Sequence, residues 1–203
     1  ALSSTLIYGR TASGKTGLVG SWARWVHRET GKKIRYYTAE AGNTDTIGDL
    51  IDAGIIDVVD VGSLPYSAEA LEYASFGYSW KDGKAVAPSN ATWEEYGGFA
   101  YEGGTSFAET LMEELKAKGA RNEIIGAEKP PQQYTSGELR IAGANQTFYG
   151  VVQGRLRRAI NASHKHATHT AWTCREVQAA DDDMISGYKE VHGPQIIGQA
   201  LTP

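Results

Sequence analysis

Near the N-terminus, residues 9–16 carry two glycines, a lysine and a threonine in the spacing G-x-x-x-x-G-K-T. The glycines let the backbone turn tightly, so that consecutive N–H groups can be aimed at one polyphosphate. Lys15 would reach the β- and γ-phosphates, and the Thr16 hydroxyl would be offered to Mg²⁺. The spacing therefore predicts a P-loop that binds a nucleoside triphosphate.

The segments on either side of this loop have the order that a P-loop requires. An apolar run at residues 6–8 precedes it, and apolar residues at positions 18, 19, 22 and 26 follow at helical spacing. A helix that begins here would add its positive N-terminal end to the phosphate site. The residues expected to bind the nucleotide are Gly9, Arg10, Thr11, Ala12, Ser13, Gly14, Lys15, Thr16 and Gly17.

Predicted strands and helices alternate along the chain. After the strand at residues 6–8, strands are expected at 34–38, 55–61, 97–102 and 166–173. Helices are expected after the P-loop, near 44–53, at 67–78, from a Ser106/Glu109 capping box to about residue 118, and at 148–160. Residues 120–144 are expected to form a long loop. This alternation predicts an α/β fold, a mainly parallel sheet with helices on both faces and the ligand at the carboxyl ends of the strands.

Composition limits the class of protein. The 203 residues, 41% hydrophobic and 22% charged, suit one well-filled domain over residues 1–203, which could be the core of a longer chain. A net charge of −4 argues against coating nucleic acid by overall electrostatics, yet it permits a local basic groove. Cys174 is the single cysteine, so no intrachain disulfide can form. Because no apolar run approaches the length of a membrane span, no membrane partner is expected.

A carboxylate follows the second predicted strand. Glu40 lies 25 positions after Lys15 (40 − 15), in the segment Y-T-A-E-A of residues 37–41. This is the sheet edge where the phosphates would lie, and hydrolysis needs a positioned acceptor for the proton of the attacking water. The alternative is a solvated glutamate at a strand end.

Two acidic residues compete for the role of the Walker B carboxylate near Mg²⁺. Glu102 ends the segment F-A-Y-E and is followed by Gly-Gly-Thr-Ser and a predicted helix, so it is preferred. It departs from the usual aspartate, and Asp60, at the end of the more apolar third strand, is the alternative. At the end of the last strand, Thr173 and Arg175 are candidate sensors of the γ-phosphate, with Cys174 between them as a small filler.

These segments together resemble phage RecA-like P-loop ATPases, including the Sak-type single-strand annealing ATPases. The resemblance rests on the P-loop, on E-G-G-T-S at 102–106, on W-T-C-R-E at 172–176 and on G-P-Q-I-I-G at 193–198. It implies a RecA-like core that binds ATP and Mg²⁺, with Glu40 as the base that polarises the attacking water. It also implies a homo-oligomer, a ring or filament, in which a neighbouring subunit supplies a positively charged side chain, an arginine finger, to the nucleotide site. Arg121 and Arg140 are candidates for that finger.

The resemblance implies an ATPase acting on DNA in phage recombination, annealing or replication, located in the cytoplasm of the host. Arg155, Arg157 and Arg158, on the helix at 148–160, are expected to contact the phosphates of single-stranded DNA, with a solvated helix face as the alternative. Other hypotheses are a DNA-packaging or translocation motor on the same core, a nucleotide-dependent assembly protein, and a small-molecule P-loop kinase. The Arg-rich lid expected of such a kinase is not evident.

Overall fold

The computed structural model describes residues 2–40, 42, 44–61, 79–81, 84–86, 94–120, 133–136, 139–142, 146–165, 168–178 and 192–194. Its strands are β1 (Ser4–Gly9), β2 (Lys33–Thr38), β3 (Ile56–Asp60), β4 (Ser79–Lys81), β5 (Lys84–Val86), β6 (Tyr96–Glu102), β7 (Gln133–Ser136), β8 (Leu139–Ala142), β9 (His169–Gln178) and β10 (His192–Pro194). Its helices are α1 (Lys15–Thr30), the short 3₁₀ turn η1 (Asp45–Ile47), α2 (Gly48–Asp52), α5 (Gly104–Ala120) and α6 (Gln146–Ser163). The helix predicted at 67–78 lies outside the described residues.

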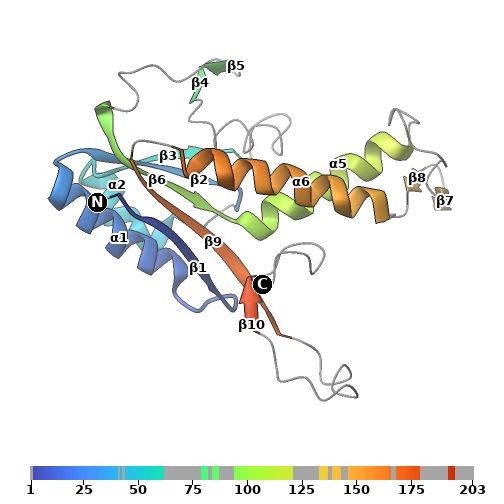
Figure 1. Ribbon diagram of the computed structural model, residues 1–203, viewed down its shortest axis with the longest axis horizontal. Helices are drawn as coiled ribbons and strands as arrows, with labels where there is room; N and C mark the ends of the chain where they lie inside the picture. Colours follow the sequence, from blue (N-terminus) through green and yellow to red (C-terminus); the bar gives the residue numbers. More distant parts are fainter. Residues whose placement is uncertain are drawn as a thin grey trace.

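In the described part of the chain, five parallel strands form the main sheet in the order β1-β9-β6-β2-β3 (Figure 1). β10 adds an antiparallel pairing with the far end of β9. The predicted α/β fold with a mainly parallel sheet is therefore confirmed. Two separate hairpins, β4-β5 and β7-β8, lie outside this sheet.

The chain builds the sheet in two directions. It runs outward from β1 to β2 and β3, and later inserts β6 and β9 between β1 and β2. Right-handed crossovers in opposite directions must place their helices on opposite faces. Figure 1 shows this arrangement, with α1 and α2 on one side of the sheet and α5 and α6 on the other. As a result, the carboxyl ends of β1, β9, β6 and β2 lie next to one another.

Successive side chains along each strand point to opposite faces of the sheet, and each face contributes to its own hydrophobic core. Tyr36 and Tyr37, adjacent on β2, are fully buried on opposite faces. The face that carries Tyr36 packs against α1, η1 and α2 through Val19, Ala23, Val26, Ile47 and Leu50. The face that carries Tyr37 packs against α5 and α6 through Phe107, Leu111, Phe148, Val152 and Leu156. On that face Tyr37, Tyr101 and Trp172 stack across three strands, with centroid separations of 5.4 and 4.4 Å. Packing on both faces fixes the strand ends relative to one another.

Several boundaries differ from the predictions. α5 begins at Gly104, so Ser106 lies inside the helix and the predicted Ser106/Glu109 capping box is wrong. The cause is Gly103, whose positive φ of 96° turns the chain directly from β6 into the helix. The segment 120–144, expected to be a loop, contains the hairpin of β7 and β8. Among the described residues, no helix has the length and apolar character needed to cross a membrane.

Candidate functional site

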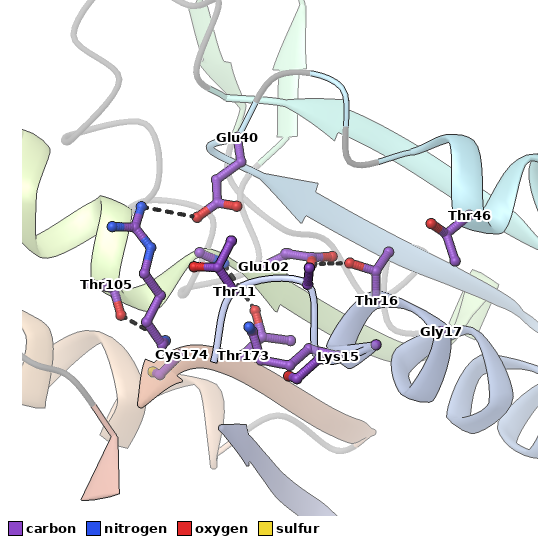
Figure 2. A pocket seen from close by; sticks show the side chains of 15 residues that line it. Thr11, Lys15, Thr16, Gly17, Glu40, Thr46, Glu102, Thr105, Thr173 and Cys174 are labelled. Carbon is purple, nitrogen blue, oxygen red and sulfur yellow. Dashed lines mark hydrogen bonds and ion pairs between the residues drawn. The ribbon is translucent and has the colours of Figure 1, made fainter. Parts of the chain in front are cut away.

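A pocket of about 350 Å³ lies at the carboxyl ends of β1, β9, β6 and β2 (Figure 2). Residues 11–17, 102–103 and 173–175 line it, together with Glu40, Thr46 and Thr105. This position is where ligands bind in open parallel α/β sheets, and the volume lies within the range typical of ligand pockets. The pocket therefore brings together the P-loop, the end of β2, the β6–α5 junction and the end of β9.

The backbone of the P-loop is shaped for an anion. Ala12 has a φ of 61° and is the only non-glycine with a positive φ among the described residues; Gly14 has a φ of 84°. Left-handed residues in such a turn direct successive N–H groups toward one point. Gly14 is the N-cap of α1 without a side-chain hydrogen bond, and the first turn of the helix holds no acidic residue. The positive end of a helix of 16 residues is thus open to a negatively charged ligand.

Lys15 is held over this loop by backbone carbonyls. Its Nζ donates hydrogen bonds to the carbonyl oxygens of Gly9 at 3.0 Å and Arg10 at 2.8 Å. The ammonium group therefore lies beside the cradle that residues 11–17 form. Gly9 and Arg10, predicted to bind nucleotide, are not among the pocket-lining residues and contribute here through these two carbonyls.

Glu102 and Thr16 are in direct contact. The Thr16 hydroxyl donates a hydrogen bond of 2.5 Å to Oε1 of Glu102, whose side chain is only 3% exposed. The other carboxylate oxygen, Oε2, is buried and has no hydrogen-bond partner in the described part of the chain. A buried carboxylate oxygen beside a hydroxyl oxygen matches the hard oxygen ligands that Mg²⁺ prefers. The residues present thus fit the divalent cation that the P-loop implies.

The surroundings of Glu102 oppose its ionisation. Burial raises the pKa of Glu102, while the Thr16 hydrogen bond and the nearby Lys15 ammonium lower it by smaller amounts. A carboxyl whose pKa is raised by folding stabilises the folded state most at pH values below the ordinary glutamate pKa. That contribution is lost as the pH rises through the folded-state pKa. Glu102 therefore contributes less to the stability of the folded protein at neutral pH than at acidic pH.

Glu102→Gln is consequently expected to stabilise the ligand-free protein at neutral pH. Glutamine keeps an oxygen for the Thr16 hydroxyl and cannot take on the charge that burial disfavours, and the gain should lie within the roughly 0.5–2 kcal/mol common for single stabilising substitutions. Urea unfolding followed by tryptophan fluorescence would measure it, and the difference from wild type should shrink as the pH falls toward 4. Glu113→Gln, which removes an exposed carboxylate paired with Lys116, is the control. A Glu102→Gln variant less stable than wild type at neutral pH would contradict this account.

Glu40 reaches the pocket from the end of β2. The Thr38 hydroxyl accepts a hydrogen bond from the Glu40 amide at 3.1 Å and donates one to the Glu40 carbonyl at 3.0 Å, which fixes the backbone turn. Oε1 of Glu40 accepts a 2.5 Å hydrogen bond from the Ser106 hydroxyl. Thr38 lies opposite Glu102 in the β2–β6 register, so the two candidate carboxylates come from neighbouring strand ends.

Thr173 lies within β9, the strand between the P-loop strand and β6, one residue past the last β6–β9 pair, which joins Tyr101 and Trp172. Its Oγ1 accepts a hydrogen bond of 3.1 Å from the Gly103 amide, which ties β9 to the residue that follows β6. A hydroxyl that accepts this bond still has its own O–H to donate. Because Thr173 lines the pocket, that donor is available to a ligand oxygen, which is what a γ-phosphate sensor requires.

Other predicted site residues lie elsewhere. Asp60 pairs with Thr38 at the far edge of the sheet and does not line the pocket, so the structure brings Glu102 rather than Asp60 to Thr16. Arg155, Arg157 and Arg158 are on α6, apart from the pocket lining. Arg121 lies outside the described residues, and Arg140 is in β8.

Cys174 lines the pocket, but its environment argues against nucleophilic chemistry. The residue is buried, and burial raises the pKa of its thiol to about 12, with the Lys15 ammonium lowering it by a smaller amount. A thiol with this pKa stays protonated at neutral pH, whereas the thiolate is the nucleophile. The interpretation of Cys174 as a small filler agrees with this geometry.

Some residues at the site were not predicted to belong to it. Thr46 lines the pocket from the turn before α2, and its side chain packs near Gly17. Thr105 also lines the pocket, and its hydroxyl accepts a hydrogen bond of 2.9 Å from the Arg175 amide. The available signal was the Gly-Gly-Thr-Ser segment after Glu102, whose hydroxyl residues stand immediately beside the candidate carboxylate.

No protein-family model matches the chain, and no curated protein matches it at a significant level. What the protein does is therefore inferred from the residues and geometry of this pocket.

Proposed function

We propose that the protein is a Mg²⁺-dependent P-loop ATPase with a RecA-like core. One observation carries this proposal: Lys15, the Thr16–Glu102 pair and Glu40 converge on one pocket from three different strand ends. A phosphate-binding loop alone would fit many nucleotide-binding proteins. A metal-binding pair on one side of the phosphates and a second carboxylate at the pocket are the parts that hydrolysis needs in addition.

Each residue has a chemical task in this proposal. The N–H groups of the P-loop and Lys15 bind the phosphates, and the Thr16 hydroxyl and Glu102 hold the cation. Bound Mg²⁺ supplies charge neutralisation on the β- and γ-phosphate oxygens. Glu40 orients the attacking water and accepts its proton, which general-base catalysis requires. The Thr173 hydroxyl donates to the γ-phosphate.

The strand order supports the RecA-like part of the proposal. One strand, β9, lies between the P-loop strand β1 and the strand β6 that ends in Glu102. Thr173 is on this inserted strand and lines the pocket together with the P-loop and Glu102, which supports its proposed contact with the terminal phosphate. We include in the proposal that the ATPase works as a homo-oligomer, a ring or a filament, as the resemblance implies.

The third part of the proposal is that the ATPase acts on single-stranded DNA through α6. The buried side of α6, with Phe148, Val152 and Leu156, packs into the core beneath it. Arg157 and Arg158 are exposed on the same helix. Since the overall charge is negative, binding to phosphates has to come from a local cluster of this kind, repeated between subunits.

Wild-type protein is expected to release phosphate from ATP only with Mg²⁺, and single-stranded DNA should stimulate this release. Fluorescence anisotropy of a labelled oligonucleotide should show affinity that falls steeply with salt, because binding releases counterions. The triple variant Arg155→Ala, Arg157→Ala, Arg158→Ala should flatten the salt slope by about one unit per lost phosphate contact. Nucleotide binding should remain, because these arginines do not line the pocket.

The control for this series is Arg28→Ala, which removes an exposed cation from α1. A strictly monomeric protein without DNA affinity at low salt would remove the DNA-binding part of the proposal. Stimulation by duplex rather than single-stranded DNA would favour a packaging or translocation motor. Phosphorylation of an added nucleoside or nucleotide, without hydrolysis, would replace the ATPase by a small-molecule kinase.

A further inference from the structure

An arginine of β9, Arg175, which pairs with the last residue of β1, connects the candidate base to α5. The guanidinium of Arg175 donates from Nη1 to Oε1 of Glu109 at 3.1 Å and from Nη2 to the Ser106 hydroxyl at 3.1 Å. Nη2 also lies 3.6 Å from Oε1 of Glu40, the ion pair drawn as a dashed line at Glu40 in Figure 2. Arg175 thus lies between two carboxylates and a hydroxyl at the pocket.

The hydrogen bonds in this group have one possible direction. A guanidinium can only donate, so the Ser106 oxygen accepts from Arg175 and its own proton is directed at Glu40. The Ser106–Glu40 separation of 2.5 Å is that of a short, charge-assisted O–H···O⁻ bond. One carboxylate oxygen of Glu40 is therefore fixed by a relay that runs from Arg175 through Ser106.

The relay is anchored on rigid elements. Ser106 and Glu109 stand three positions apart on α5, a spacing that places both side chains on one side of the helix. The backbone amide of Arg175 is bound to the hydroxyl of Thr105 at 2.9 Å, which ties β9 to the first turn of the same helix. Glu40 also packs against Gly103, where an added Cβ would come within 3.4 Å of its Cγ. The carboxylate is held from three sides.

We propose that Arg175 and Ser106 are positioning residues for Glu40, which set the orientation in which its carboxylate faces the attacking water. The inference rests on the proposed ATPase function and adds a requirement to it, because the base would work only while the relay is formed. Of these two positioning residues, Ser106 gives the clearer test. It does not line the pocket, so its hydroxyl can affect turnover only through the residues that it contacts, Glu40 and Arg175.

Ser106→Ala is expected to lower kcat for ATP hydrolysis by about 10- to 100-fold, the loss that removing a hydrogen bond to a charged group produces. The KM for MgATP should stay nearly unchanged. Alanine is a better helix former than serine, so α5 should persist. Ser106→Thr, which restores a hydroxyl, should recover most of the rate. Thr110→Ala, one turn along, is the matched control, because it removes a hydroxyl that, among the described residues, bonds to the helix carbonyl of Ser106.

A double-mutant cycle separates positioning from a general structural effect. In a Glu40→Gln background, measured by single-turnover hydrolysis, Ser106→Ala should change the residual rate by less than about twofold. Glu109→Gln, which loosens the anchor of Arg175, should lower kcat in the wild-type background and have no further effect in Glu40→Gln. This second variant tests the relay even if Ser106→Ala fails to fold.

The outcomes are distinct. Turnover of Ser106→Ala and Glu109→Gln equal to that of Thr110→Ala would overturn the relay and leave the ATPase proposal standing. An equal loss from Ser106→Ala with and without Glu40 would also overturn it, since Ser106 would then act by another route. No hydrolysis of any nucleoside triphosphate by the wild-type protein would remove the proposed function and the relay together.

Discussion

Lys15→Ala is expected to abolish turnover, with a loss of at least about 10²- to 10³-fold, the scale on which removing one electrostatic contact to a transition state acts. In the proposed function this ammonium group contacts the β- and γ-phosphates. Its removal also takes away a charge that lowers the pKa of Glu102, so the cation-binding carboxylate would ionise less readily. Weaker triphosphate binding and a greater need for Mg²⁺ should accompany the lost turnover.

The fold should survive this substitution. In the structure Lys15 Nζ contacts the carbonyl oxygens of Gly9 and Arg10, and neither bond belongs to the core. Thermal unfolding, titration with a fluorescent ATP analogue and phosphate release would be measured on the same preparation. Lys33→Ala, which removes an exposed lysine where β2 begins, is the matched control. Wild-type affinity and turnover in a folded Lys15→Ala variant would exclude the P-loop assignment.

The parts of the site that the sequence predicts are those encoded by local spacing. The P-loop is one segment, and the hydrogen bonds of Lys15 within it go to Gly9 and Arg10, which are close to it in sequence. Glu40 and Thr173 could be placed because parallel strands bring their carboxyl ends to one edge of the sheet. For the same reason, the mainly parallel α/β fold could be predicted from alternating strands and helices.

The choice between Glu102 and Asp60 depends on the order of the strands. Both residues end an apolar strand, so spacing along the chain does not separate them. β6 enters the middle of the sheet and β3 takes its edge, and this arrangement brings Glu102 to Thr16 and keeps Asp60 outside the pocket. Strand order follows from how all helices pack on both faces, which is information distributed over the whole chain.

Ser106 and Glu109 show how one pattern can serve two purposes. The spacing S-x-x-E before an apolar helix is the pattern of a capping box, and it predicts contacts between neighbours in sequence. In the structure Gly103 starts the helix earlier, and the two side chains instead contact Glu40 and Arg175, which are 66 positions away from Ser106 and Glu109 respectively. The local sequence pattern therefore identifies Ser106 and Glu109 as polar residues that make contacts, but it does not predict which distant residues they contact.

Glu40→Gln is expected to bind MgATP nearly as well as wild type and to lose most turnover. Glutamine retains an oxygen that can accept the Ser106 hydrogen bond, so the side chain should keep its place while losing its basicity. Removing a general base costs roughly 10²- to 10⁴-fold in rate. Single-turnover and steady-state hydrolysis at saturating MgATP would measure the loss, with Glu113→Gln as the control for removing a surface carboxylate.

Glu102→Gln should differ from Glu40→Gln in its dependence on the cation. Glu102 touches Thr16 and offers a buried oxygen, so its neutral form should bind Mg²⁺ more weakly, and added Mg²⁺ should restore part of the rate. Glu40→Gln should not respond to added Mg²⁺, because its defect lies in the proton transfer. A Mg²⁺ titration of both variants at fixed ATP separates the two roles. If Glu40→Gln keeps full turnover while Glu102→Gln alone is inactive at every Mg²⁺ concentration, Glu102 is the base and the roles proposed here are reversed.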